Sequence, residues 1–273
     1  ERSLESIGTL TRWNEFDFVT WEVKSLFERF SAATISIERY LSDEQQAEAV
    51  LRYLDQVGYV EQLEAELEST SFDPNARSSM EERQRTQEVL NDETERMHRY
   101  GQLAESIIQN QTERSLIELG FGVGGQIFPP VLFKVSDLPL NLIISPRDEI
   151  TTIKTISLNP GMDAVEKDTL ENKIYHQFDL SALVEPVGGL GAYPAMIMRS
   201  RSLTWLTEVV AHEWLHNYLT FHPLGIRYFQ SSDLRSMNET LANLAGKEIG
   251  RWTMINYYPE LVSMVQFTGR EAS

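Results

Sequence analysis

The chain has 273 residues, of which 41% are hydrophobic and 10% aromatic, so it can bury a substantial core, and a disordered or fibrous protein is excluded. Its 41 acidic and 24 basic residues give a net charge of −17, which argues against nucleic acid or an anionic membrane as the main partner. Because the chain has no cysteine, it cannot form disulfides, thiolate metal sites or a cysteine nucleophile. Its chemistry must therefore come from histidine, carboxylates, hydroxyls or a metal.

The sequence gives little information about the cellular location of the protein. A transmembrane helix needs about 18 or more apolar residues in a row. The longest apolar stretches are interrupted by Lys134, Asp137 and Asn141, so no transmembrane segment is predicted. The absence of cysteine favours an extracytoplasmic protein, whether secreted, periplasmic or membrane-tethered by a segment outside this sequence, and leaves a cytoplasmic location open.

Residues 1–126 are predicted to form an acidic helical region. Apolar residues recur at three- and four-residue steps over Phe16–Phe30 and again over Val50–Val57, which is the spacing of amphipathic helices. The charged faces of these helices are expected to be solvated rather than to bind a partner. The glycine-rich segment Gly120–Gly125 is interpreted as a turn or hinge, because it lacks the strand before it and the helix after it that a phosphate-binding loop requires.

Two capping signals predict helix starts within this region. Ser42 is followed three residues later by Gln45, and Ser79 is followed by Glu82, which is the spacing of a capping box. The helix that begins near Ser79 is expected to run to the glycine-rich segment, with one break near Gly101.

Residues 127–273 are predicted to form a second region that contains both strands and helices. Short β-branched and apolar segments over 131–135, 140–145 and 151–158 predict a small, mainly antiparallel sheet. A helix is expected over 163–177. Together with the preceding helices, these elements predict an α+β protein.

The segment 203–221 is predicted to form an apolar helix with a boundary on each side. Ser202 or Thr204 can cap its start, and Pro223 disfavours helical backbone at the residue before it. This helix carries the pattern H-E-x-x-H.

The two histidines of this pattern are predicted to be zinc ligands. His212 and His216 stand four residues apart, so a helix places both imidazoles on one face, where they can approach one metal ion. Glu213 lies about 100° around the helix from His212, beside the ion rather than on it. The alternative is a pair of core histidines and a glutamate that hydrogen bonds satisfy.

A catalytic zinc of this kind needs a third protein ligand and a fourth position left to water. A second helix is predicted to begin at Ser231 or Ser232, and Glu239 lies within it, far enough after the first helix for the chain to reverse direction. We expect Glu239 to be the third ligand. Glu248 is its nearest competitor, and a merely solvated Glu239 is the remaining alternative.

Two further residues of the second helix are expected to support the site. Gly246, seven residues after Glu239 and so on the same face, would let the two helices approach closely. Asn243, four residues after Glu239, is placed to orient a metal-ligating imidazole.

These motifs resemble the gluzincin zinc metallopeptidases, the thermolysin-like class in which an H-E-x-x-H helix is joined by a glutamate from an N-E-x-x-x-D segment on the next helix. The matching residues are His212, Glu213, His216, Asn238 and Glu239. The resemblance covers about residues 185–250 and identifies no family within the class. It implies a zincin-like catalytic region that binds Zn²⁺. One departure is Asn243, which stands where the class usually has Asp, so the partner of the imidazole would be neutral.

A second element fits the same class. The segment 188–198 resembles the sheet-edge strand along which gluzincins hold an extended substrate, and its Pro194 is tolerable only at an edge or a bulge. We therefore expect Gly191, Ala192 and Tyr193 to bind substrate, and an ordinary glycine-rich turn is the alternative. Aminopeptidases of the class carry a glutamate in this strand. The segment has none, so an endopeptidase is preferred.

The predicted function is a zinc-dependent endopeptidase that acts on a peptide or protein substrate. Two imidazoles and one carboxylate leave a zinc site with a charge of about +1, so the metal can acidify its water and polarise a scissile carbonyl. Glu213 is expected to act as the general base that takes a proton from the zinc-activated water and passes it to the leaving nitrogen. The candidates for the oxyanion donor are Tyr228 first and His222 second, with Tyr218, Tyr257 and Tyr258 also available.

The alternative function is a catalytically inactive zinc-binding scaffold or interaction protein. A structural zinc needs no general base and is usually closed by four protein ligands, so Glu213 favours the enzyme. Residues 1–126 could also cover the strand at 188–198 through a hinge at 120–125. A fixed helical lobe is expected instead, because domain packing is commoner than gating.

Overall fold

The computed structural model describes residues 2–18, 20–22, 24–25, 40–69, 78–149, 151–186, 189–190 and 192–263. These residues form helices and two small sheets, which confirms the mixture of helix and sheet expected from the sequence. The helices are α1 (Arg2–Thr11), α3 (Asp43–Ser69), α4 (Ser78–Glu118), α5 (Ala164–Phe178), α6 (Leu203–Leu219), α7 (Pro223–Ile226) and α8 (Ser232–Tyr257). The strands are β1 (Phe133–Val135), β2 (Leu140–Ser145), β3 (Lys154–Leu158), β4 (Ser181–Pro186), β5 (Gly189–Leu190) and β6 (Ala195–Ile197).

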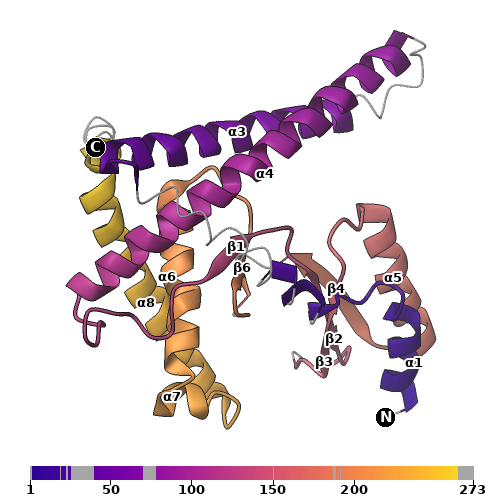
Figure 1. Cartoon of the computed structure of the whole chain (residues 1–273). Coiled ribbons are helices and arrows are strands. Elements are labelled where there is room, and N and C mark those ends of the chain that lie inside the picture. The colour runs from indigo at the N-terminus through magenta and orange to yellow at the C-terminus, as the bar shows by residue number, and fades with distance from the viewer. Residues whose placement is uncertain are drawn as a thin grey trace, which may run out of the picture.

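Helices α3 and α4 form a long hairpin that crosses above the rest of the chain (Figure 1). The capping box at the start of α3 is confirmed: the Ser42 N–H donates to Gln45 Oε1 at 2.9 Å, and the Gln45 N–H donates to Ser42 Oγ at 3.2 Å. The break predicted near Gly101 is wrong, because α4 is continuous through it. Gly101 serves packing instead, since a Cβ there would lie 3.3 Å from the ring of Tyr53 on α3.

Two other helix predictions fall partly outside the described residues. Helix α4 begins at Ser78, beside the predicted start, but the side chain of Ser79 is not among those described. Of the helix expected over Phe16–Phe30, the structure describes eight residues. Residues 16 and 17 are not helical, and residues 18, 20–22 and 24–25 are helical.

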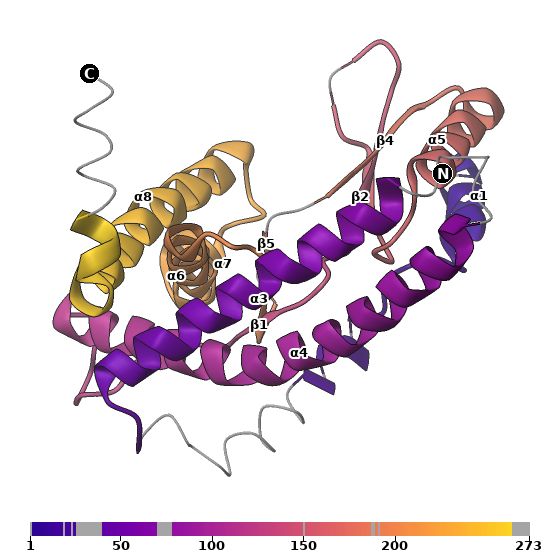
Figure 2. The same ribbon diagram turned by 90° about the horizontal axis from the view of Figure 1, so that it is seen from above.

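Helices α6 and α8 lie side by side beneath one end of the hairpin (Figures 1 and 2). Ser202 caps α6 and Ser231 caps α8, each by accepting the N–H three residues further on, as the sequence predicted. Their close approach depends on Gly246, where a Cβ would lie only 3.1 Å from the Cα of His212. The predicted role of Gly246 is therefore confirmed.

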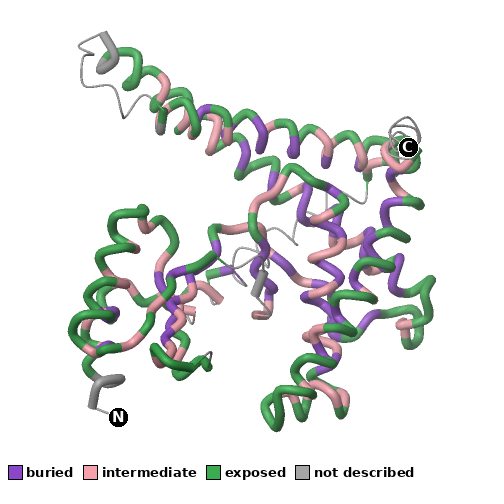
Figure 3. The backbone as a smooth tube through the Cα atoms, turned by 180° about the vertical axis from the view of Figure 1, so that it is seen from behind, coloured by how far each residue is buried: buried purple, intermediate pink, exposed green. Residues whose placement is uncertain are grey.

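One hydrophobic core joins the hairpin to α6, α8, β1 and β6. Members of this core from the four helices include Val57, Ile107, Leu206 and Ile249. Figure 3 shows buried backbone where these helices meet and exposed backbone at the far end of the hairpin. The hairpin therefore packs as part of the same body as α6 and α8.

Buried hydrogen bonds also fasten α4 to the C-terminal helix. The Tyr258 hydroxyl, at the end of α8, donates to Gln111 Oε1 at 2.7 Å. The Thr253 hydroxyl donates to Ser115 Oγ at 2.9 Å. These two bonds and the shared core join α4 to the C-terminal end of α8.

The strands form two separate sheets rather than the single sheet predicted. Strand β2 pairs antiparallel with both β3 and β4, so the antiparallel expectation holds for this sheet. Strand β1, the first of the predicted strands, instead pairs parallel with β6, and β5 completes that sheet by pairing antiparallel with β6. The residue pattern of a strand shows which face is buried but not which strand is its neighbour, and β1 and β6 are far apart in sequence.

A second hydrophobic core lies between the sheet β3-β2-β4 and helices α1 and α5. Helix α1 contributes Ile7 to this core, and the chain after α1 forms a bridge to β3 between Glu15 and Leu158. Helix α5 begins after Asp163, which accepts the N–H of Glu166 in a capping box, so the helix predicted over 163–177 is confirmed.

The predicted division into residues 1–126 and 127–273 coincides with neither core. The first core combines α3 and α4 with α6 and α8, and the second combines α1 with β2, β3, β4 and α5. Each core therefore draws on both sides of the predicted boundary. Within the part of the chain that the structure describes, no helix is both long and apolar enough to cross a membrane.

Candidate metal centre

Three side chains from α6 and α8 converge at one point. The Nε2 atoms of His212 and His216 lie 3.0 Å apart, and Glu239 Oε2 lies 3.7 Å from the first and 3.4 Å from the second. These residues, which we call the His-His-Glu cluster, each offer one ligand atom to a common point. The structure thus brings together the three residues that the sequence predicted as metal ligands, and the cluster could hold a metal ion.

The local fold explains why the three residues meet. His212 and His216 are four residues apart on α6 and so lie one turn apart on one face. Glu239 lies on α8, which the missing side chain of Gly246 allows to pack closely against α6. A second glycine on the same helix, Gly250, contacts α6 in the same way, because a Cβ there would lie 2.8 Å from the Cα of Glu208.

Both imidazoles are oriented by hydrogen bonds at the ring nitrogen that points away from the cluster. Nδ1 of His216 lies 2.8 Å from Oδ1 of Asn238, whose side chain is buried. The ring of His212 is hydrogen-bonded to the main chain of Ala242, and because its Nε2 faces His216, Nδ1 is the nitrogen left for this bond. Asn243 was expected in this role, but it is exposed. The neutral partner of His212 is therefore a main-chain group, and the amide that orients an imidazole belongs to Asn238.

These bonds decide which ring nitrogens carry protons. A carbonyl oxygen accepts hydrogen bonds, so both Nδ1 atoms donate and both Nε2 atoms present lone pairs in the neutral imidazoles. Two lone pairs that face each other at 3.0 Å repel, and a shared cation removes this repulsion. With both Nε2 atoms unprotonated, His212 and His216 are arranged so that one cation could bind between them.

The distances within the cluster suit a tetrahedral zinc site. Zinc bonds of about 2.0–2.1 Å to nitrogen or oxygen place neighbouring ligand atoms about 3.3 Å apart. The three separations of 3.0, 3.4 and 3.7 Å scatter around this value. Two imidazoles with one carboxylate are also a donor set that catalytic zinc sites use.

Glu213 lies next to the cluster without being part of it. Its side chain is only 5% exposed, although it carries a carboxyl group. Burial, and after it the negative charge of Glu239, raise the pKa of Glu213 to about 8. Burial, and after it the neighbouring His216, lower the pKa of His212. A divalent cation at the cluster would favour the ionised form of Glu213, which is the form that accepts a proton.

Tyr228 is the predicted oxyanion donor that the structure places at the cluster. Its hydroxyl donates to Oε1 of Glu239 at 3.0 Å. Burial, the hydrogen bond to Glu239 and the charges of Glu239 and Glu213 raise the pKa of Tyr228, against an opposing effect of Arg235. The phenol therefore stays protonated and remains a donor.

The other candidate donors have partners elsewhere. Nδ1 of His222 donates to the carbonyl oxygen of Tyr218 at 2.9 Å, and their two rings stack with centres 4.2 Å apart. Tyr258 is buried against α4, and Tyr257 is hydrogen-bonded to Arg114.

The segment predicted to hold substrate is a hairpin rather than one strand. Strand β6 is the middle strand of its sheet, and β5 is one of the two edge strands, in the order β1-β6-β5. Ala192 and Tyr193 lie in the turn between β5 and β6, whereas Gly191 lies outside the described residues. The Asn217 side chain donates to the carbonyl oxygen of Ala192 at 3.4 Å, and this bond ties the turn to α6 beside His216.

A carboxylate also reaches this turn from the N-terminal part of the chain. The N–H of Tyr193 donates to Oε1 of Glu22 at 3.4 Å. The Tyr193 hydroxyl donates to the carbonyl oxygen of Pro130 at 3.2 Å. The predicted absence of a carboxylate holds for the segment itself but not for its surroundings.

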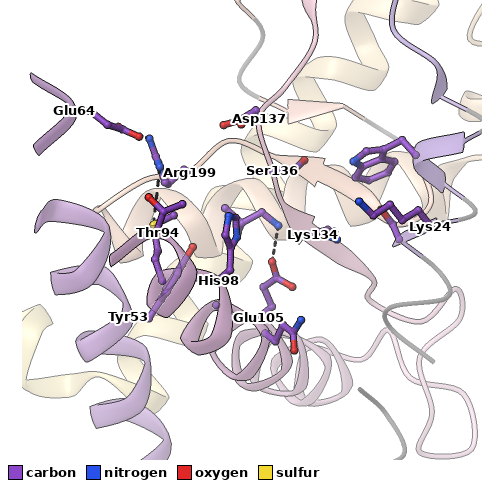
Figure 4. Close-up of a pocket in the computed structure, with 16 residues that line it drawn as sticks. Lys24, Tyr53, Glu64, Thr94, His98, Glu105, Lys134, Ser136, Asp137 and Arg199 are labelled. Atoms are coloured by element: carbon purple, nitrogen blue, oxygen red, sulfur yellow. Dashed lines mark hydrogen bonds and ion pairs between the residues drawn. The ribbon is translucent and has the colours of Figure 1, made fainter. Parts of the chain in front are cut away.

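The structure has a separate cavity of about 570 Å³ between the hairpin and β1 (Figure 4). None of the His-His-Glu cluster lines it. Three acids and three bases face it, namely Glu64, Glu105 and Asp137, and Lys24, Lys134 and Arg199. Arg199 pairs with Glu64 at 2.7 Å, and Lys134 points toward Glu105 (Figure 4). Because acids and bases are balanced around it, the cavity shows no preference for a ligand of either charge.

Three residues beside the cluster lie outside the sequence-based site prediction. Arg235 could have been found from its spacing, because it stands four residues before Glu239 and so shares its helix face. Asn217 follows His216 directly, but its contact with the β5–β6 turn depends on tertiary packing. Ala242 acts through its main chain, so its side chain carries no signal.

Comparison of the chain with protein-family models, with curated proteins and with solved structures found no match. The gluzincin resemblance therefore stays an expectation drawn from the motifs. Support for a function comes from the cluster and its surroundings.

Proposed function

We propose that this chain is a zinc-dependent endopeptidase of the gluzincin type. The observation that carries the proposal is the convergence of His212 Nε2, His216 Nε2 and Glu239 Oε2 at zinc-like spacing. His212, His216 and Glu239 would hold the ion. The region around α6 and α8 would then correspond to a zincin-like catalytic region.

The residues of the site have complementary roles in peptide hydrolysis. A zinc ion, when bound, polarises the scissile carbonyl and acidifies the attacking water. Glu213, buried beside the cluster, accepts a proton from water and passes it to the leaving nitrogen. The Tyr228 hydroxyl, which donates to Glu239 in this structure, turns from that carboxylate to donate to the negative charge that develops on the carbonyl oxygen.

The substrate is proposed to bind as an extended strand along β5. This strand is one of the two edges of its sheet among the described strands, and a sheet edge offers main-chain hydrogen bonds to a peptide. The turn that follows β5 is tied to α6 through Asn217, next to His216.

An inactive zinc scaffold is the competing function. A closed structural site usually has four protein ligands, whereas the described residues offer three. A purely structural site also gains nothing from a buried carboxyl such as that of Glu213, which burial penalises. Both features favour the enzyme.

One experiment tests the proposal directly. The full chain is purified, its zinc content is measured by mass spectrometry of the metal, and hydrolysis of a mixture of unstructured peptides is followed by mass spectrometry. We expect cleavage at internal bonds that a chelator abolishes and added zinc restores. Zinc binding with no hydrolysis of any peptide would instead identify a scaffold. Chelator-resistant cleavage would overturn the role of the cluster.

A further inference from the structure

Arg235 is an exposed cation beside the His-His-Glu cluster. It lies on α8 four residues before Glu239, so the two side chains leave the same face of the helix one turn apart. Its guanidinium carbon is 5.8 Å from the ring centre of Tyr228, whose hydroxyl is bonded to Glu239. Contacts therefore lead from Arg235 through Tyr228 to the proposed metal ligand.

Among the described residues, no carboxylate pairs with Arg235. Arg251, further along the same helix, lies 4.0 Å from Glu248 and so has such a partner. A guanidinium presents five N–H donors in a planar arrangement that suits a carboxylate. Arg235 thus has the capacity to bind a carboxylate that the described part of the chain does not supply.

The stretch between Glu213 and Asp233 is free of acids. Residues 214–232 include no Asp or Glu, although the whole chain has 41 acidic residues and a net charge of −17. The same stretch contains Arg227, which is exposed and follows α7. This stretch therefore adds no negative charge that would repel a carboxylate at Arg235.

We propose that Arg235 is a specificity-determining residue that binds a carboxylate of the peptide substrate close to the scissile bond. The proposal rests on the proposed peptidase function and adds a substrate class to it. One turn of helix rises about 5.4 Å, and one extended residue spans about 3.3 Å. The carboxylate therefore lies within about two residues of the bond that is cut, either on an Asp or Glu side chain or at the C-terminus of the substrate.

The test measures cleavage by the zinc-loaded full chain of one peptide sequence with Glu, Gln or Lys at each position in turn. Every peptide is made with a free and with an amidated C-terminus, and mass spectrometry locates the cut. We expect kcat/KM to be up to about fivefold higher for a Glu peptide than for its Lys counterpart, or for a free than for an amidated C-terminus. The first result identifies a side-chain carboxylate and the second a terminal one.

Three variants of arginines on α8 make the test specific. R235Q should abolish the preference, and R235E should reverse it toward Lys. R251E carries the same charge change on the same helix and should keep the preference of the unaltered protein. The preference should also shrink as ionic strength rises, because salt screens an exposed charge pair. A preference that R235Q and R235E leave unchanged would overturn the proposal.

A binding measurement separates this inference from the peptidase function. Affinities of the same labelled peptides are measured by fluorescence anisotropy with the zinc-loaded E213Q protein, in which hydrolysis is suppressed. If carboxylate-bearing peptides bind more tightly, and if R235E removes this difference, the Arg235 site is supported. If the unaltered protein then cleaves no peptide, only the peptidase function fails. Cleavage or binding without any carboxylate preference defeats the Arg235 proposal alone.

Discussion

Oδ1 of Asn238 lies 2.8 Å from Nδ1 of His216, and this contact fixes both the orientation and the protonated nitrogen of the imidazole. Asn238 directly precedes Glu239 on α8. One short piece of this helix therefore supplies the carboxylate of the cluster and also the group that aims one of its histidines.

Replacing Asn238 should weaken metal binding without removing a ligand. We expect N238A to lower zinc affinity about 10- to 100-fold, because the ring of His216 loses its fixed orientation. N243A is the matched control, since Asn243 is an exposed amide on the same helix. Competition with a chromogenic zinc chelator measures both affinities. Equal affinities for the two variants would contradict the role given to Asn238.

Loss of either histidine should remove zinc. We expect H212A and H216A to lose the stoichiometric zinc of the unaltered protein, because each leaves only two of the three ligand atoms. H176A is the control, since His176 lies in the last turn of α5, a helix that packs in the second core and not beside the cluster. Metal analysis after dialysis gives the zinc content, and circular dichroism checks that each variant is folded. Full zinc occupancy in both folded variants would show that the cluster is not the site.

Replacing Glu213 should impair peptide hydrolysis without affecting zinc binding. E213Q keeps the size of the side chain but cannot accept a proton from water. We expect zinc content to be unchanged and kcat to fall on the order of 10²- to 10⁴-fold. Zinc analysis and peptide hydrolysis on the same preparation measure the two effects. A variant that cleaves at the unaltered rate would give Glu213 another role.

The preference for an internal bond can be tested through the carboxylate of Glu22. This carboxylate accepts a hydrogen bond from the N–H of Tyr193, beside the β5–β6 turn. From there it could bind the amino terminus of a substrate. For an endopeptidase we expect N-acetylated peptides to be cut as fast as peptides with a free amine, and E22Q to leave that ratio near one. If cleavage instead requires a free amine, and if E22Q abolishes this requirement, the protein would be an aminopeptidase.

Gly246 should not tolerate a side chain. Alanine within a helix is usually favoured over glycine by about 1 kcal/mol. At position 246, however, a Cβ would lie 3.1 Å from the Cα of His212, so α6 and α8 must move apart. We expect G246A to lower the free energy of unfolding by about 1–3 kcal/mol and to weaken zinc binding. K247A, at the exposed neighbouring position, should do neither in urea denaturation and chelator competition.

The two helices of the candidate site could be predicted because their signals are local. Ser202 and Ser231 cap helices by interactions that span three residues, and the spacing of His212 and His216 depends only on helical geometry. Even the pairing of α6 with α8 left a trace in the sequence, because Gly246 falls on the face that bears Glu239.

Other features depend on partners that lie far away along the chain. The pattern of β1 could not show that Phe133 would pair with Ala195 in a parallel sheet. Gly101 has the signature of a helix break, yet its missing side chain makes room for Tyr53. Asn243 was a reasonable partner for an imidazole by spacing alone, and only the packing of α8 shows that the main chain of Ala242 takes that place.

The position of Ile7 in the second core affects when this core can form during protein synthesis. Its partners on β2, β3, α5 and β4 are translated more than a hundred residues later. Until β2 and β3 have left the ribosome, α1 has no sheet to cover, and α3 and α4 likewise wait for α6 and α8. Contacts this distant along the chain form slowly. We expect the nascent chain to expose apolar surface for most of its translation and to rely on chaperones more than a protein whose lobes follow one another along the sequence.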